Sequence, residues 1–221
     1  MRRLLRENGL SIVLLVLFLL FMAGQVLTGL HEYNQNLLER GEEAIGLTAY
    51  LGSGHFWEAT AENWESEFLQ MAAYILLTVM LFQRGSSESK DPDREEPVDR
   101  DPRQSAGKIN MPGPVRRGGW VLKLYENSLS LVFVILFLLS IAVHAIGGAV
   151  AYSEEQVAEG RSPIAVVEYL QTTRFWFESF QNWQSEFLSL AAMVILTVFL
   201  RQRGSPESKP VDTPHGETGG D

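Results

Sequence analysis

The chain carries one pattern twice. Residues 5–90 and 124–209 align without a gap at an offset of 119 positions, and roughly 38 of about 86 aligned positions are identical. The apolar runs lie at about 10–30 and 66–82 in the first copy and at about 129–151 and 185–200 in the second, and they predict helices at about 10–30, 60–83, 129–151 and 179–202. Because an α-helix rises about 1.5 Å per residue, about 20 residues cross a ~30 Å hydrocarbon layer. The duplication therefore predicts an all-α membrane protein with four transmembrane helices in two two-helix repeats.

The distribution of basic residues predicts the orientation of these helices. The N-terminus, the central linker and the tail hold 15 of the 18 Lys and Arg residues, and the two intervening loops hold only Arg40, Arg161 and Arg174. By the positive-inside rule both termini are cytoplasmic. Each copy crosses the membrane twice, so the copies are parallel repeats about an axis along the membrane normal. The first run resembles a signal peptide, but its counterpart lies in mid-chain, where a signal peptide cannot be.

The charged segments between and after the repeats divide the chain into four parts. Residues 1–90 and 121–209 are the membrane repeats. Residues 91–120 and 210–221 are rich in charge, Pro and Gly and carry few bulky apolar side chains. Such segments bury too little surface to offset the entropy of ordering, so we predict a disordered cytoplasmic linker and tail.

The motif Asn-Trp-x-Ser-Glu-Phe-Leu occupies 63–69 and 182–188, and each copy follows a Phe-Trp pair. Aromatic side chains with a polar N–H favour the membrane–water boundary. The simplest interpretation is therefore a set of interfacial anchors: Trp57, Trp64, Trp176 and Trp183.

A polar stripe on the same helices offers a second interpretation. Glu67 and Glu186 stand at matching positions, and polar groups that face lipid are costly. We expect this stripe to face the bundle interior, where two nearby carboxylates could form a proton or cation site. The residues of this candidate site are Glu67, Glu186, Asn63, Asn182, Thr78 and Thr197.

Other repeated positions suggest structural roles. Gln25 and His144 match one another inside the first spanning helices, where hydrogen bonding between helices is the usual function of such groups. Gly24, Gly29, Gly147 and Gly148 would permit close helix approach. Asn8 and Asn127 are expected to cap helix starts. The repeated Glu-Ser-Lys at 88–90 and 207–209 has no evident structural need.

No catalytic signature is present in the sequence. The chain lacks a zinc-protease motif, a phosphate-binding loop, a nucleophile elbow and a dinucleotide fingerprint, and it has no cysteine. We therefore expect a protein that is not an enzyme, with no catalytic residues, no metal and no cofactor. The net charge of −9 gives nucleic-acid binding no support.

The assembled motifs, Glu-Asn-x-Leu-Ser, Asn-Trp-x-Ser-Glu-Phe-Leu and Gln-Arg-Gly-Ser-x-Glu-Ser-Lys, resemble a family of small bacterial membrane proteins classified only as a domain of unknown function. The similarity covers 1–90 and 121–209 and leaves out the linker and tail. The resemblance implies a bacterial cytoplasmic (inner) membrane location. It brings no activity, substrate or catalytic residue.

Three functions follow as hypotheses. The leading one is association within the bilayer, with lipid, a second copy of the chain or another membrane protein as partner. The alternative is a small proton or cation transporter or channel that uses paired glutamates. The third is an accessory in envelope stress or signalling.

Overall fold

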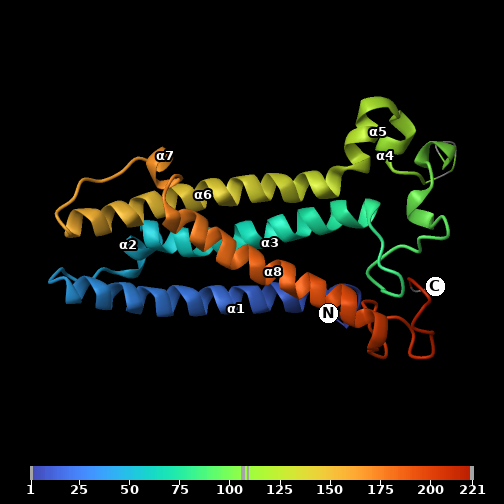
Figure 1. Cartoon of the computed structure of the whole chain (residues 1–221), viewed down its shortest axis with the longest axis horizontal. Helices are drawn as coiled ribbons and strands as arrows, with labels where there is room; N and C mark the ends of the chain where they lie inside the picture. Colours follow the sequence, from blue (N-terminus) through green and yellow to red (C-terminus); the bar gives the residue numbers. More distant parts are fainter. Residues whose placement is uncertain (1, 106–107, 109, 220–221) are drawn as a thin grey trace. The chain divides into compact units, whose positions relative to one another are not determined.

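The computed structural model describes residues 2–105, 108 and 110–219, and these residues form helices and turns without a strand (Figure 1). The long helices are α1 (Arg2–Glu39), α3 (Gly54–Met80), α6 (Ser128–Ala158) and α8 (Thr173–Phe199). The shorter elements are α2 (Leu47–Leu51), η1 (Pro97–Asp99), η2 (Pro102–Ser105), α4 (Gly113–Arg117), α5 (Gly119–Glu126) and α7 (Val166–Tyr169).

Among the described residues, α1, α6 and α8 are long and apolar enough to cross a membrane. The helix α3 equals α8 in length, at 27 residues, but four glutamates lie in its first half. The all-helical, membrane-like class is thus confirmed with three candidate spans. The fourth span and the cytoplasmic termini stay predictions.

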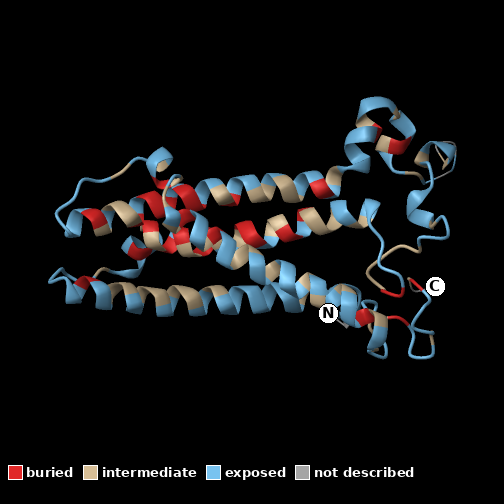
Figure 2. Cartoon of the chain, viewed as in Figure 1, coloured by how far each residue is buried: buried red, intermediate tan, exposed pale blue. Residues whose placement is uncertain are grey.

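The apolar part of α1 is exposed along its length (Figure 2). Leu15, Leu19 and Phe21 are 62%, 62% and 72% exposed. In water, a continuous apolar surface of this kind marks a site that a membrane or a partner covers. The helix therefore has the surface expected of a lipid-facing segment.

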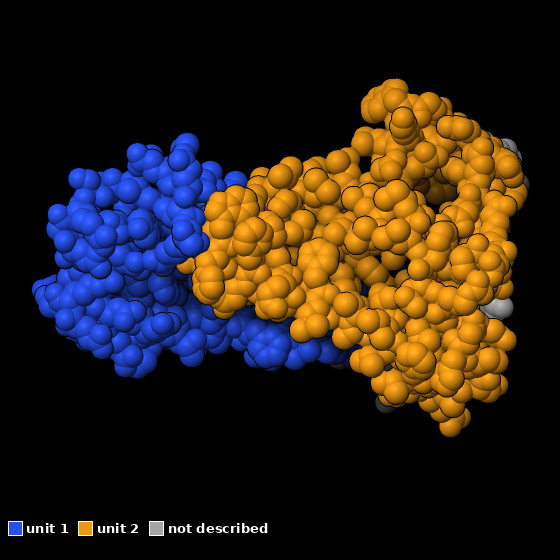
Figure 3. All heavy atoms as spheres, viewed as in Figure 1, with its two compact units in different colours: residues 1–61, 142–175 blue, residues 62–141, 176–221 orange. Residues whose placement is uncertain are grey.

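The chain forms two compact units, which are coloured separately in Figure 3. Unit 1 comprises residues 1–61 and 142–175, and unit 2 comprises residues 62–141 and 176–221.

Unit 1 contains a matched pair of glycine–tyrosine contacts. Tyr50 of α2 and Tyr169 of α7 are almost fully buried. A Cβ added to Gly29 would lie 2.1 Å from the Tyr50 hydroxyl, and one added to Gly148 would lie 2.5 Å from the Tyr169 ring. The missing side chains therefore create the space that the two tyrosines fill. Burial, helped by the charge of Glu32, raises the pKa of Tyr50.

The backbones of α3 and α6 approach closely in unit 1. A Cβ on Gly54 would lie 2.6 Å from the carbonyl oxygen of Gly147, and a Cβ on Gly147 would lie 2.7 Å from the Glu58 nitrogen. The expected close helix approach is therefore observed at Gly147, whereas Gly29 and Gly148 leave room for tyrosine side chains. Gly24 has open space around it.

The Glu-Asn-x-Leu-Ser segments at 7–11 and 126–130 do not show the expected asparagine caps at the helix starts. Asn8 and Asn127 leave the helical region of backbone conformation, with φ of −130° and −112°. Their side-chain amides donate to the carbonyl oxygens of Leu4 (3.4 Å) and Lys123 (2.8 Å), each four residues earlier. Each asparagine thus satisfies the end of the preceding helical turn and marks a break before the long apolar helix.

The loops that follow α3 and α8, the exit loops at 81–90 and 200–209, belong to unit 2 and share one geometry. Gly85 and Gly204 have φ of 86° and 84°, a region that favours glycine. Ser89 accepts a hydrogen bond from the Gln83 backbone N–H at 2.8 Å. Ser208, the counterpart of Ser89 in the second copy, accepts a hydrogen bond from the Gln202 N–H at 2.9 Å. The serine of the repeated Glu-Ser-Lys therefore closes the turn after each second helix.

The lysine of that motif anchors the segment after it. Lys209 is 1% exposed, and its ammonium donates to the backbone carbonyls of Pro214 (3.2 Å), His215 (3.2 Å) and Glu217 (2.7 Å). Burial is the main cause that lowers the pKa of Lys209. Lys90 instead donates to the Asp99 carboxylate in η1 at 2.6 Å. The expected disorder of 91–120 and 210–221 stays a prediction, although the described parts of both segments contain specific contacts.

Candidate functional site

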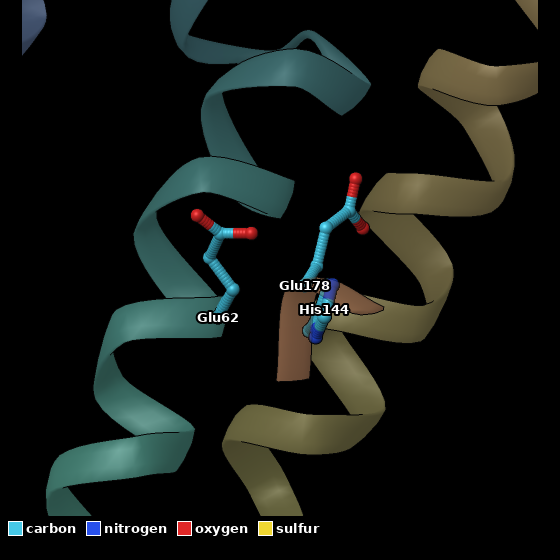
Figure 4. A group of neighbouring side chains, drawn as sticks. All are labelled: Glu62, His144 and Glu178. Carbon is cyan, nitrogen blue, oxygen red and sulfur yellow. The ribbon is translucent and has the colours of Figure 1, made fainter. Parts of the chain in front are cut away.

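Two glutamates on neighbouring helices bring their carboxylates together in unit 2. Glu62 lies on α3 and Glu178 lies on α8 (Figure 4). A carboxylate oxygen of one lies within 4.8 Å of a carboxylate oxygen of the other, and both residues are half-buried. Two carboxylates this close repel one another when both are ionised, and a proton or a cation shared between them relieves the repulsion. The pair is therefore chemically suited to hold a positive charge.

A third carboxylate lies one turn further along α3. Glu65 is fully buried and accepts a hydrogen bond from the indole Nε1 of Trp183 at 3.2 Å. The Trp183 ring packs edge-on against Phe137, with ring centroids 6.3 Å apart. A buried carboxylate needs hydrogen-bond donors in place of water, and the Trp183 indole supplies one to Glu65.

A side-chain amide joins α3 to α8 about two helical turns beyond these acids. Gln70 Nε2 donates to the Glu186 backbone carbonyl at 2.9 Å and to the Ser189 hydroxyl at 3.2 Å. Gln70 is itself buried. These bonds hold the register of the two helices, which determines the separation of Glu62 and Glu178.

The acidic residues of α3 follow helical spacing. Glu58, Glu62 and Glu65 are separated by four and three residues, so they share one face of the helix. Glu58 belongs to unit 1, where its carboxylate lies 3.5 Å from the Arg174 guanidinium and accepts a hydrogen bond from the Tyr169 hydroxyl at 3.0 Å. Glu58 is thus neutralised by an ion pair within its own unit.

Glu67, one of the two glutamates chosen from the sequence, lies on a different face of α3 from Glu65. Glu67 and Asn63 are exposed, so the expected inward orientation is not observed for them. Glu186 is half-buried and lies close enough to Glu67 for the two charges to interact. Asn182 donates to the Glu178 carbonyl at 3.2 Å, a bond within α8.

The threonines of the stripe make local bonds. Thr78 donates to the Tyr74 carbonyl at 3.0 Å within α3. Thr197 is buried and shares a 2.8 Å hydrogen bond with the Ser86 hydroxyl in the first exit loop. Thr78 therefore acts within its own helix, and Thr197 links α8 to an exit loop.

Gln25 and His144 are both within unit 1. Gln25 Nε2 donates to the Thr60 hydroxyl at 3.1 Å, which joins α1 to α3. His144, also labelled in Figure 4, is fully buried, and its ring centroid lies 4.8 Å from that of Phe175. The expected helix–helix bond is therefore present for Gln25.

The four tryptophans divide into two pairs. Trp57 and Trp176 are each 41% exposed, whereas Trp64 and Trp183 are half-buried. Trp176 packs edge-on against Trp183, with ring centroids 6.5 Å apart. At least Trp183 therefore contributes to packing and to binding Glu65 as well as to any interfacial anchoring.

Comparison with known proteins identifies a family and nothing beyond it. A family model described as a domain of unknown function, DUF6766, matches residues 1–220. The chain belongs to the DUF6766 family. No curated protein and no solved structure matches it. The match covers the linker and tail of this DUF6766 chain, so it extends beyond the two segments that carried the resemblance.

Sequence reasoning missed the acidic pair of this DUF6766 chain because its members do not repeat. The counterpart of Glu62 is Gln181, and the counterpart of Glu178 is Ala59. A search for identity between the copies therefore passes over both. The spacing of glutamates along α3, which places three acids on one face, could have identified Glu62, whereas no comparable pattern points to Glu178 on α8.

Proposed function

We propose that the protein is a four-span integral membrane protein of the bacterial inner membrane, built from two parallel repeats with both termini in the cytoplasm. The three apolar helices and the whole-chain family match support this assignment. The length of α3, which has 27 residues and a mainly apolar second half, supports a fourth span. The concentration of Lys and Arg in the termini and linker supports the orientation.

Its function, in our proposal, is to bind and conduct protons or small cations rather than to catalyse a reaction. One observation carries this proposal: the carboxylates of Glu62 and Glu178 lie within 4.8 Å of one another on long helices. Ionisable groups inside membrane helices are costly and usually mark ion or proton pathways. The buried carboxylate of Glu65 extends the acidic face of α3 by one turn.

A flux assay tests this proposal. Purified protein is reconstituted into liposomes that contain a pH-sensitive dye, and a potassium gradient with valinomycin drives proton entry. We expect flux above that of protein-free liposomes, and we expect Glu62→Gln with Glu178→Gln to reduce it to background. Glutamine keeps the size of the side chain but removes its charge and its proton site.

Two further variants make the assay decisive. Glu39→Gln removes one exposed carboxylate at the end of α1 and should leave the flux unchanged. Glu67→Gln with Glu186→Gln removes the pair chosen from the sequence. A protein that folds but never conducts protons, Na⁺ or K⁺ would overturn the proposal, as would a loss of flux in the second pair alone.

The exposed apolar surface of α1 favours a second function, association within the bilayer. A helix whose apolar stretch has no buried residue in the folded chain can contact lipid or a second protein. The chain has no cysteine, so Leu19→Cys introduces a unique thiol on this surface. Disulfide-linked dimers in native membranes, absent for the buried Ala61→Cys, would support association between copies.

A further inference from the structure

Unit 1 contains a second site, a cavity of about 880 Å³ between the ends of α1 and α6 and the loops that follow them. All of its lining residues belong to this unit. Cavities that hold small organic ligands usually measure about 300–1,000 Å³. We propose that this cavity binds a lipophilic organic cation. The proposal goes beyond ion conduction at Glu62 and Glu178, because it concerns different residues.

The walls of the cavity are mainly apolar. Leu37 and Ile45 line one side, and Val150 and Val157 line it from α6. An apolar ligand body that enters this space is removed from water, which stabilises the complex in proportion to the apolar surface that is buried. The walls therefore favour a ligand with a hydrocarbon or aromatic body.

The charges of the cavity select the sign of the ligand. Glu42, Glu43 and Glu154 contribute three carboxylates, whereas Arg40 contributes one positive charge. The three negative charges and the one positive charge of the lining therefore give it a net charge of −2. An organic cation is complementary to this lining, and an anion of the same shape is repelled.

An oriented carboxylate and an aromatic ring give the cation a specific place. The Tyr33 hydroxyl donates to the Glu154 carboxylate at 2.9 Å, which fixes this acid beside the ring. Tyr33 itself packs against Tyr50 and His55, with ring centroids 5.9 and 5.2 Å apart. A cation that enters can contact the carboxylate and the face of the tyrosine ring together.

The loops that form the cavity wall are held by repeated hydrogen bonds. Asn34 donates to the Ile45 carbonyl at 3.0 Å and accepts from the Ile45 N–H at 2.8 Å. Ser153 makes the same two bonds to Ile164, at 3.3 and 3.1 Å. Both loops are thus fixed to their helices before a ligand arrives, which lowers the entropic cost of binding.

The test uses the full chain in lipid nanodiscs and radiolabelled tetraphenylphosphonium, with protein-free nanodiscs as the background. We expect saturable binding that tetraphenylborate, an anion of the same shape, does not compete for. Glu154→Gln should weaken binding about tenfold, the effect of losing one charge contact of about 1.4 kcal/mol. Glu39→Gln, which removes a carboxylate outside the cavity, should bind as the native chain does.

A variant with tighter binding distinguishes loss of the site from misfolding of the protein. Arg40→Gln removes the repelling charge and should tighten binding, a result that an unfolded variant cannot give. The double variant of Glu62 and Glu178 should retain binding, which separates this site from the conduction proposal. Equal binding of tetraphenylborate, or equal affinities for Glu154→Gln and Glu39→Gln, would overturn the inference.

Discussion

The two copies of the repeat agree in their framework and differ in their charge. Gly29 with Tyr50 matches Gly148 with Tyr169, and the exit loops close with the same serine bonds. The acidic face of the first copy has no equivalent, because the counterparts of Glu58, Glu62 and Glu65 are Phe177, Gln181 and Gln184. Identity between the copies therefore identifies residues that hold the fold. The residues with distinctive chemistry lie where the copies differ.

The largest expected effect comes from the ion pair at Glu58. Glu58 is 5% exposed, and Glu58→Ala removes its carboxylate from the Arg174 guanidinium, which keeps its ion pair with the partly exposed Glu155. Removal of one member of a buried pair typically costs about 3–5 kcal/mol, so we expect a loss near 3 kcal/mol. Unfolding in mixed detergent micelles measures it.

The residue that matches Glu58 in the second copy, Phe177, provides a second variant for this prediction. Glu58→Phe gives the first copy the residue that the second copy has at this position, and it should be as destabilising as Glu58→Ala. Glu155→Ala, on a side chain that is 38% exposed, should cost less than 1 kcal/mol, as is usual for exposed pairs. Equal losses for Glu58→Ala and Glu155→Ala would contradict the assigned role.

The glycine–tyrosine contacts should respond differently to the same change. Gly29→Ala and Gly148→Ala each force a methyl group into an occupied space, and we expect each to cost about 1–3 kcal/mol. Tyr50→Phe should restore Gly29→Ala, because the hydroxyl is the atom that blocks its methyl group. Tyr169→Phe should not restore Gly148→Ala, because ring carbons also lie 2.5 and 2.6 Å from the new methyl group.

Unfolding measurements on the single and double variants test this difference, with Gly24→Ala as the control. Gly24 has nothing within 4 Å of an added Cβ, so its replacement should be harmless or slightly stabilising. Restoration of both double variants would show that the two contacts are equivalent.

The smallest effect is expected at the repeated lysines. Lys209→Met removes three hydrogen bonds from a buried ammonium, and we expect a local loss of about 1–2 kcal/mol. The tail beyond this residue should then be cut faster by a protease. Lys90→Met removes one bond to a surface carboxylate and should change cleavage of the linker less. Equal increases in the cleavage of the tail by Lys209→Met and of the linker by Lys90→Met would contradict the stronger anchoring role assigned to Lys209.

Much of the fold could be predicted from the sequence because apolar runs and their spacing determine the helices. The helices predicted at 10–30, 129–151 and 179–202 overlap α1, α6 and α8. The breaks at Asn8 and Asn127 depend on side-chain bonds to the preceding turn, which the motif does not specify. The contacts of the tail depend on residues far apart in sequence, such as the Gly85 N–H and the Thr218 hydroxyl at 2.8 Å, and composition does not reveal them.

The candidate site was harder to predict. The choice of Glu67 and Glu186 rested on their identity, whereas burial depends on which face of α3 meets α8. That face is determined by packing, through bonds such as the one from Trp183 to Glu65. A difference of two residues between Glu65 and Glu67 reverses the direction of the side chain on a helix. The correct helix could be predicted, but its buried side could not.

The burial of Lys209 makes this residue a chemical reporter. An amine-reactive reagent must reach the nitrogen, and the Lys209 side chain is covered while its ammonium is bound to the tail carbonyls. Lys90, with a side chain that is 18% exposed, is more accessible to the same reagent. The ratio of acylation at these two positions, read by mass spectrometry in intact cells, therefore measures how often the tail is released from the native protein.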